Sequence, residues 1–586
     1  MRACCRNSLF TIVAAFSSAF ASTTVLAQQG ATQPSFDPRQ LERRFDDAQT
    51  PQRRDARPQA VVPRVSPPPG PVGPPAGTRD AKTQFKLVAV SVAGSAAVPH
   101  DVVAEAWQPY IGKQVSEADL AALAAAITEK YRQTGYFLTR AIIPPQNIRG
   151  GRVRVEVIEG SIAEIGLTGE NAAAFGLDPL LDVIKAERPA RLSTLERQLL
   201  LIGDRPGVRI VDTTLDEIGK TTGRFRLAIK LQAWRVYSAW GFDNLGSSAV
   251  GPWQTYATAA FNSYFVPGDA LSVNVSSVAP EPRELGFGRV SYDAPIGIDG
   301  VRVGGSALFS DVRPGDDFRR ETRNRTRTET FEARASVSPI QSQALSMVLT
   351  SAFGFSDVLQ DDMYGLIYRD RIRTLTLTAD FRIRDPFNGV SYLSLIGRQG
   401  LDVFGASQVD DPFVSRAGAS GEFSVFNAWF TRYHTFSDEW SLKVSAAGQL
   451  ANQALLLSQQ FYLGGSAFGR GYGAAEISGD NAFAGSVELR LDQTFNSPYL
   501  KGIQFYGFLD SGVVWNDGYH MRDGLSLTSV GVGARFFLAE DLQAGVGVAF
   551  PLSYRAPDNL SRDPRLLFSL SSAFRVCPER SKAICS

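Results

Sequence analysis

The second half of the chain repeats short segments in which apolar and polar residues alternate. In residues 374–383 the odd positions are Leu, Leu, Ala, Phe and Ile, and the even positions are Thr, Thr, Thr, Asp and Arg. A period of two predicts a β-strand with one apolar and one polar face. Sixteen such segments follow one another, and no helical pattern separates them. They lie near residues 236, 253, 270, 286, 301, 327, 344, 368, 389, 420, 439, 482, 501, 526, 541 and 565.

An even number of strands of roughly ten residues is typical of an outer-membrane barrel. The connections between the segments give an independent test of this interpretation. Those after even-numbered segments are mostly short, as at residues 267–269 and 297–300, whereas several after odd-numbered segments are long and polar, as at 313–325 and 407–417. Short periplasmic turns and long external loops are the barrel pattern. We therefore predict an all-β, 16-stranded transmembrane barrel over residues 234–574, with the preceding residues in the periplasm.

Two small modules that mix helices and strands precede the barrel, at residues 84–160 and 161–233. In the first module, Ser116 and Asp119 predict the start of a helix that Gly135 ends. Strands are expected there at 85–92, 137–143 and 152–157. In the second module we expect a strand near residue 165, helices at 180–184 and 192–202, and strands at 208–213 and 225–231. Both modules present sheet edges that can accept an added strand, and neither shows a catalytic constellation.

The first 83 residues contain three segments of different composition. Residues 1–27 have a basic start and an apolar run too short to span a bilayer, which predicts a cleaved signal peptide, with a retained anchor as the alternative. In residues 28–49, Asp37 and Pro38 predict the start of a short, mostly charged helix that either sits in an aqueous cavity or frays in solvent. Residues 50–83 are rich in proline and predict an extended linker.

The C-terminal end also has a pattern of its own. The last predicted strand places Phe568 and Phe574 on one face, and an extension at residues 575–586 follows it. That extension holds Cys577 and Cys585. In an oxidising periplasm these two cysteines either close a small loop or stay as free thiols.

Charge and motif content narrow the functional classes. The formal net charge is +1, so bulk attraction to nucleic acid is not expected. The three histidines show no triad context, and the sequence has neither a P-loop nor a His/Cys ligand cluster. Gly469-x-Gly471-x-Gly473 lacks the strand and helix that flank a dinucleotide site. We therefore expect no enzyme activity, no cofactor and no metal.

The candidate chemistry lies in the longest loop, residues 451–482. A surface loop should be polar, yet Arg470 is surrounded there by Phe461, Tyr462, Leu463, Phe468 and Tyr472. Such a loop is better accommodated in a barrel lumen than in water, and a buried guanidinium needs a carboxylate partner. We predict that Asp510, in Phe508-Leu-Asp-Ser-Gly512, is this partner.

These motifs resemble a known family. The stretch Gln460-Phe-Tyr-Leu-Gly-Gly … Arg470-Gly471-Tyr472 … Ser478-Gly-Asp-Asn … Glu488-Leu is similar to the loop-six region of two-partner secretion transporters, the haemolysin- and adhesin-exporting branch of the BamA-type superfamily. Phe508-x-Asp510-x-Gly512 resembles the barrel-wall motif that holds the arginine of that loop. Gly135, Tyr136 and Arg140 resemble part of the family's first polypeptide-transport-associated (POTRA) module. The chain departs from the family pattern at Gly469, where Val usually precedes Arg-Gly-Tyr.

The resemblance implies a complete architecture and a mechanism. Residues 28–49 would be a plug helix, residues 84–160 and 161–233 would be POTRA 1 and POTRA 2, and a monomeric barrel would sit in outer-membrane lipid. The POTRA modules would capture a dedicated, unfolded exoprotein of the adhesin or haemolysin type by strand addition, and the plug helix would leave before the partner threads through the lumen. Arg470 and Asp510 would act either as a structural latch or as direct contacts to the cargo.

Two other functions remain as alternatives. One is an outer-membrane protein assembly or insertion factor of the same superfamily, although such factors usually carry more modules and no plug. The other is a passive porin, which has no use for two soluble modules ahead of its barrel.

Overall fold

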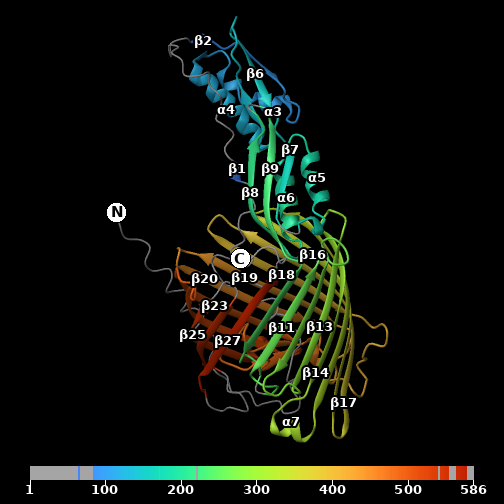
Figure 1. Cartoon of the computed structure of the whole chain (residues 1–586). Coiled ribbons are helices and arrows are strands. Elements are labelled where there is room, and N and C mark those ends of the chain that lie inside the picture. Colours follow the sequence, from blue (N-terminus) through green and yellow to red (C-terminus); the bar gives the residue numbers. More distant parts are fainter. Residues whose placement is uncertain are drawn as a thin grey trace.

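The computed structural model describes residues 64–65, 84–169, 172–219, 222–247, 249–538, 542–553 and 562–576. The predicted signal peptide, the predicted plug helix, the linker apart from residues 64–65, and both Cys577 and Cys585 lie outside the described residues. None of the helices in the described ranges is both long and apolar enough to cross a membrane. Figure 1 shows two small modules stacked on one end of a barrel.

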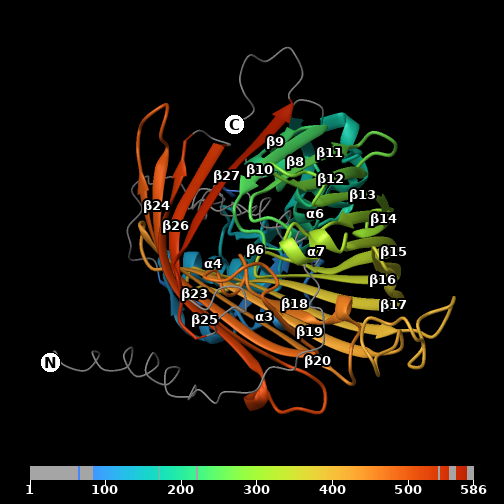
Figure 2. The same ribbon diagram turned by 90° about the horizontal axis from the view of Figure 1, so that it is seen from below.

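The barrel is a closed sheet of sixteen strands in which the first strand pairs with the last (Figures 1 and 2). Each of the sixteen predicted segments corresponds to one of these strands, so the predicted 16-stranded barrel is confirmed. The strands are β10 (Val236–Asp243), β11 (Gln254–Asn262), β12 (Ala270–Val278), β13 (Leu285–Ile296), β14 (Val301–Val312), β15 (Arg325–Gln341), β16 (Leu345–Asp362), β17 (Gly365–Arg384), β18 (Gly389–Gly400), β19 (Ser424–Thr435), β20 (Trp440–Ala451), β23 (Asn481–Thr494), β24 (Gly502–Trp515), β25 (Leu525–Phe537), β26 (Leu542–Pro551) and β27 (Arg565–Val576).

Three neighbouring strands are much longer than the sequence pattern predicts. β15, β16 and β17 contain 17, 18 and 20 residues, whereas a strand crosses the bilayer core in about 9–11 residues. Their outer ends carry charged pairs, among them Arg325 with Asp311 and Arg327 with Asp361. The apolar alternation is needed only over the length that faces lipid, and the charged pairs lie on the parts of the strands that extend past that length. The external connection between β14 and β15 contains a short helix, α7 (Asp317–Glu321).

Alternation along β17 sorts its side chains between lipid and lumen. Leu375 and Leu377 are 40% and 58% exposed on the outer face. Thr376 lies between them and therefore points inward. Its register partner on β18 is Arg398, which donates a hydrogen bond to Gln459 in the loop after β20.

POTRA 1 packs its helices on short strands. Its elements are β2 (Phe85–Lys86), β3 (Ala89–Ala93), α3 (His100–Ala104), η2 (Gln108–Tyr110), β4 (Gln114–Val115), α4 (Glu117–Gln133), β5 (Arg140–Ile142) and β6 (Arg152–Ile158). Helix α4 begins with a capping box, because the Asp119 N–H donates to the Ser116 hydroxyl and the Asp119 carboxylate accepts from the Ser116 N–H. Alternate valines of β6 are buried in the same core as one face of α4.

Two predicted strands of POTRA 1 were wrong in extent. Residues 85–92 form two strands, because Phe85 pairs with Val115 of β4 whereas Ala89 pairs with Arg152 of β6. The strand expected at 137–143 shortens to Arg140–Ile142, because Leu138 turns into the core of the second module. Periodicity shows that a segment is extended, but it does not show where the segment changes partner.

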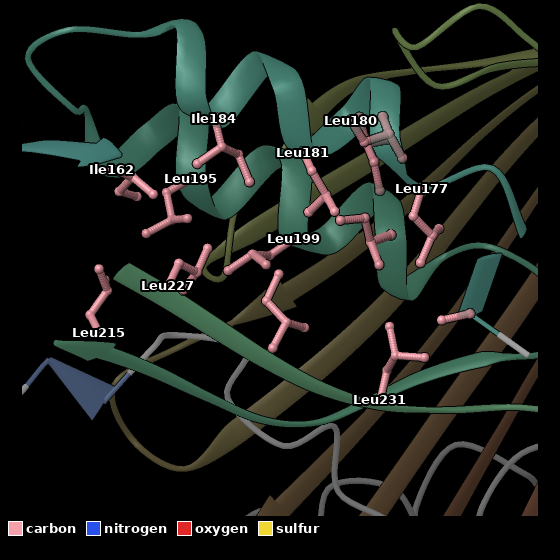
Figure 3. Packing of buried hydrophobic residues seen from close by; sticks show 14 of the residues in the cluster. Ile162, Leu177, Leu180, Leu181, Ile184, Leu195, Leu199, Leu215, Leu227 and Leu231 are labelled. Carbon is pink, nitrogen blue, oxygen red and sulfur yellow. The ribbon is translucent and has the colours of Figure 1, made fainter. Parts of the chain in front are cut away.

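POTRA 2 packs two helices on one face of a sheet (Figure 3). Its elements are β7 (Ser161–Thr168), η3 (Ala172–Phe175), α5 (Asp178–Ala186), α6 (Leu192–Gly203), β8 (Val208–Glu217) and β9 (Arg224–Ala233). Leucine and isoleucine side chains from helices and strands meet in a single buried cluster. The sheet order is β1-β8-β9-β7, and β1 (Arg64–Val65) runs parallel to Thr214 and Leu215 of β8. Linker residues therefore occupy one edge of this sheet.

POTRA 2 contacts the barrel at the end where the short turns lie. Arg197 of α6 donates hydrogen bonds to the backbone carbonyls of Ser338 and Asp299, both at 3.0 Å. Asp204, at the end of α6, accepts a hydrogen bond of 3.1 Å from Gln341. Burial at this contact raises the pKa of the Asp204 carboxyl. Both modules accordingly lie on the periplasmic side of the outer membrane.

Candidate functional site

The loop between β20 and β23, residues 452–480, is folded against the inner wall of the barrel; we call it loop 6. It contains η4 (Leu457–Gln459) and a pair of short strands, β21 (Phe461–Leu463) and β22 (Ile477–Gly479). Five of its large apolar side chains are buried in one cluster with barrel-wall residues, and three leucines are buried in two other clusters. The first set is Phe461, Leu463, Phe468, Tyr472 and Ile477, and the second is Leu455, Leu456 and Leu457. The Phe461 ring stacks on the indole of Trp429 in β19, with 5.6 Å between ring centroids. Burial against the wall accounts for the apolar composition of the loop.

The tip of loop 6, residues 469–472, is bound to Asp510 of β24. The Arg470 Nε and Nη2 atoms donate to the two carboxylate oxygens of Asp510 at 2.9 and 2.8 Å. The backbone N–H groups of Gly469 and Arg470 donate to the same carboxylate at 3.3 and 3.0 Å. The Asp510 side chain is 0% exposed, and the guanidinium lies 3.5 Å above the Phe508 ring centroid. A planar guanidinium bound bidentately to a carboxylate is a strong, directional contact.

Glu488 of β23 is a second carboxylate at this site. It accepts a hydrogen bond of 2.5 Å from Arg470, and further hydrogen bonds from Arg490 at 2.8 Å and Arg535 at 3.0 Å. Three guanidinium groups and two carboxylates thus form one connected network on the lumen wall. From the sequence, Glu488 stood out only as part of the family motif, and no role was predicted for it. The available signal was the polar face of β23, where residues 486, 488, 490 and 492 are Ser, Glu, Arg and Asp.

Two glycines bring the loop tip close to the wall. Gly469 has a φ of +90°, a backbone conformation that side-chain-bearing residues rarely adopt. This conformation gives a structural reason for glycine where the family usually has Val. Gly471 donates its N–H to the Ser529 hydroxyl at 3.2 Å, and an added Cβ would lie 2.8 Å from the Ser529 Cβ. A larger residue at 471 would push the tip away from β25.

The remaining residues of the two motifs also meet. The Tyr472 hydroxyl donates to the carbonyl of Thr528 at 3.0 Å. On β24, Gly512 faces Leu463 of loop 6, where an added Cβ would lie 2.8 Å from the leucine side chain. Phe508, Asp510 and Gly512 alternate along β24, so all three face the lumen.

The predicted POTRA 1 motif lies at a different place, the junction of the two modules. Gly135 follows the end of α4 with a φ of +94°, and its carbonyl accepts a hydrogen bond of 3.0 Å from the Leu192 N–H of POTRA 2. The Tyr136 hydroxyl accepts a hydrogen bond of 2.8 Å from Arg191 of POTRA 2, and this bond raises the pKa of Arg191. Arg140 forms a buried ion pair of 2.6 Å with Glu217 of β8. These three residues join the modules and have no contact with loop 6 among the interactions of the described residues.

The network ties the tip of loop 6 to strands β23 and β24 of the barrel wall. Both carboxylates are taken up by guanidinium groups, and Asp510 also accepts a hydrogen bond of 2.8 Å from the Ser486 hydroxyl. Within the described ranges, no group of three or more His, Cys, Asp or Glu side chains is placed to hold a metal ion.

Comparisons with known proteins give consistent results. Residues 85–160 match the POTRA domain, ShlB-type, and residues 226–536 match the haemolysin secretion/activation protein ShlB/FhaC/HecB. The heme/hemopexin transporter protein HuxB of Haemophilus influenzae is 25% identical over 77% of this chain and 80% of that protein. The outer membrane transporter CdiB of Escherichia coli is 24% identical over 81% of each chain. The solved structure of CdiB from Escherichia coli has the same fold, with a TM-score of 0.71 and 20% identity, and the match covers 92% of this chain and 97% of that one.

Proposed function

Because this chain belongs to the haemolysin secretion/activation protein family (ShlB/FhaC/HecB), the outer-membrane transporters of two-partner secretion, we propose that it exports one dedicated exoprotein of the adhesin or haemolysin type. The exoprotein is captured unfolded on the POTRA modules and threads through the lumen of a single barrel. The observation that carries this proposal is a loop folded against the lumen wall and held there by side-chain contacts to β23 and β24.

Capture by strand addition is supported by the edges of the two POTRA sheets. Residues 64–65 already lie as a parallel strand along the β8 edge of POTRA 2. An extended segment can therefore add to this edge, and the partner would have to displace the linker there. In POTRA 1 the sheet order is β3-β6-β5, which leaves β3 and β5 as outer strands among the described residues. Backbone hydrogen bonds at such edges bind an unfolded segment with little dependence on its sequence.

Arg470 acts as a latch in this proposal and makes no direct contact with cargo. Its guanidinium is already occupied by Asp510, Glu488 and Ser486. Both carboxylates are buried, so a passing chain meets them only after the loop has left its place. Transport would release the loop tip, and the same ion pairs would restore the resting state.

The predicted plug helix, residues 28–49, is part of the same proposal. It would occupy the lumen at rest and leave when the partner arrives. Its removal should raise the passive permeability of the outer membrane to small antibiotics, whereas a permeability equal to that of the full chain would contradict a plugging role.

The test is secretion of the exoprotein encoded beside this protein. Cells would carry the full chain, Arg470→Ala, a deletion of residues 84–231, or no copy, and they would express the N-terminal fragment of that exoprotein. Arg327→Ala serves as a matched control, since Arg327 pairs with Asp361 of β16 and has no bond to the loop tip among the interactions of the described residues. Surface labelling would verify equal barrel levels. We expect secretion with the full chain and the control, and loss of secretion without the POTRA modules or without the protein.

Export that continues without this protein would contradict the proposal. In that case the outer-membrane levels of other barrel proteins should be measured. A general fall in those levels would indicate an assembly or insertion factor of the same superfamily.

A further inference from the structure

Arg565, the first residue of β27, connects the tip of loop 6 to the segment that follows β10. It is not part of the network around Arg470. Its guanidinium donates one hydrogen bond to the backbone carbonyl of Tyr472 in the tip of loop 6. It donates two more to the carbonyls of Asn244 and Gly246, just after β10, at 2.8 and 2.9 Å. Arg565 faces the lumen, because its register partner on β26 is the fully buried Ala549.

The seam between the first and last strands ends at this same place. β10 is eight residues long, and its regular pairing with β27 stops at Asp243 and Ser569. Beyond that point one backbone hydrogen bond remains, from the Asn244 N–H to the Phe568 carbonyl at 3.2 Å. The Asn244 side-chain amide adds two more, donating to the Leu566 carbonyl and accepting from the Phe568 N–H, both at 2.8 Å. The external end of the seam therefore depends on side-chain hydrogen bonds in addition to a strand ladder.

We propose that Arg565 is a positioning residue that couples the tip of loop 6 to the external end of the β10–β27 seam. One guanidinium has five N–H donors in a rigid fork, so it can hold three carbonyls from two separate segments at once. If the tip moves away, Arg565 loses one of the partners that orient it toward the other two. Coupling of this kind is reciprocal, so loosening the seam also releases the tip.

The coupling differs from the Arg470 latch in its partners. Arg470 binds side chains of β23 and β24, whereas the three hydrogen bonds of Arg565 given above go to backbone carbonyls. Its use in transport rests on the proposed function, but the coupling itself is a property of the transporter without cargo. Its test accordingly needs no exoprotein.

The experiment uses the full chain in outer-membrane vesicles, with two readouts. The first is the rate of chymotrypsin cleavage within residues 461–472, which reports release of the loop. The second is hydrogen exchange at the amides of Asn244 and Phe568, which reports opening of the seam. Arg565→Ala, Arg565→Lys and the control Arg327→Ala would be compared, each with and without Asp510→Asn.

We expect Arg565→Ala to raise both rates by about tenfold, because a hydrogen bond from a charged donor commonly changes an equilibrium by that factor or more. Arg565→Lys should give an intermediate effect. This variant keeps the test possible if the alanine variant assembles poorly. Asp510→Asn should speed exchange at the seam when Arg565 is present, and it should add nothing when Arg565 is absent.

Two results would overturn the inference. One is a loop that Arg565→Ala leaves as resistant to cleavage as Arg327→Ala does. The other is an equal effect of Asp510→Asn on the seam with and without Arg565. Because neither readout involves secretion, a failure here leaves the transport proposal untouched, and loss of secretion leaves this result untouched.

Discussion

Replacing Arg470 with alanine removes the residue that binds the tip of loop 6 to the barrel wall. Glu488 would keep Arg490 and Arg535 as partners, so the loss falls mainly on Asp510. That carboxylate is 0% exposed and would retain the Ser486 hydroxyl at 2.8 Å. Removing one member of a buried ion pair costs about 3–5 kcal/mol. Since Asp510 keeps other donors, we take the lower end, about 3 kcal/mol, which corresponds to about a hundredfold shift toward the released loop.

The assay is chymotrypsin cleavage from outside intact cells. Phe468 and Tyr472 are each 5% exposed, so cleavage beside them requires release of the loop. Phe318 and Tyr364 are 72% and 83% exposed in other external connections, and their cleavage serves as an internal reference. We expect Arg470→Ala to raise cleavage in loop 6 by about a hundredfold relative to that reference, and Arg470→Lys to raise it less, since lysine keeps the charge but loses the two-bond contact. Cleavage within about threefold of the unchanged chain would refute the reasoning from buried ion pairs.

Three further predictions concern backbone strain, helix capping and the attachment of POTRA 2. Gly469→Val places a branched residue at a φ of +90°, which costs about 1–3 kcal/mol and should speed loop cleavage, whereas Gly397→Val should not. Ser116→Ala should destabilise α4 by about 1 kcal/mol, seen as faster amide exchange in residues 117–133. Hydrogen bonds from Ser116 lower the pKa of the Asp119 carboxyl. The stability that this carboxylate gives to the start of α4 is therefore full above the usual aspartate pKa of about 3.9 and is lost as the pH falls through the lowered pKa. Protection of the α4 amides that stays unchanged down to about pH 2 would contradict this. Arg197→Ala removes the bonds from α6 to the barrel and should broaden spin-label distances between POTRA 2 and the barrel, while an unchanged distribution would show that other contacts hold the module.

The fold was largely predictable because lipid and lumen impose a period of two on every strand. The positions of all sixteen strands followed from that period. Strand lengths did not, since the charged pairs of Arg325 and Arg327 extend β15 and its neighbours beyond the lipid. In POTRA 1 the period identified extended chain at residues 85–92, but it could not show that the chain changes partner there.

The candidate site was predictable only in part. Arg470 stood out because a lone charge in an apolar loop requires a partner, and Asp510 followed from the motif around it. The polar alternation of their strands marked Glu488 and Arg565 as lumen-facing but did not single them out, because a polar residue on a lumen face resembles the other residues of that face. Their partners lie 18 and 93 residues away along the chain, and only the closed barrel brings them together. The role of the site as a latch remains a proposal.

The central claim is that an exoprotein passes through the lumen, and neighbouring residues of β17 offer the most direct test. A photo-crosslinking amino acid would be placed at residue 376, which points inward, or at residue 377, whose leucine is 58% exposed toward lipid. The exoprotein fragment would carry a tightly folded C-terminal fusion that stalls it during export. We predict crosslinks to the stalled fragment from position 376 and none from position 377. Crosslinks from 377 alone, or from neither position while secretion continues, would contradict passage through the barrel.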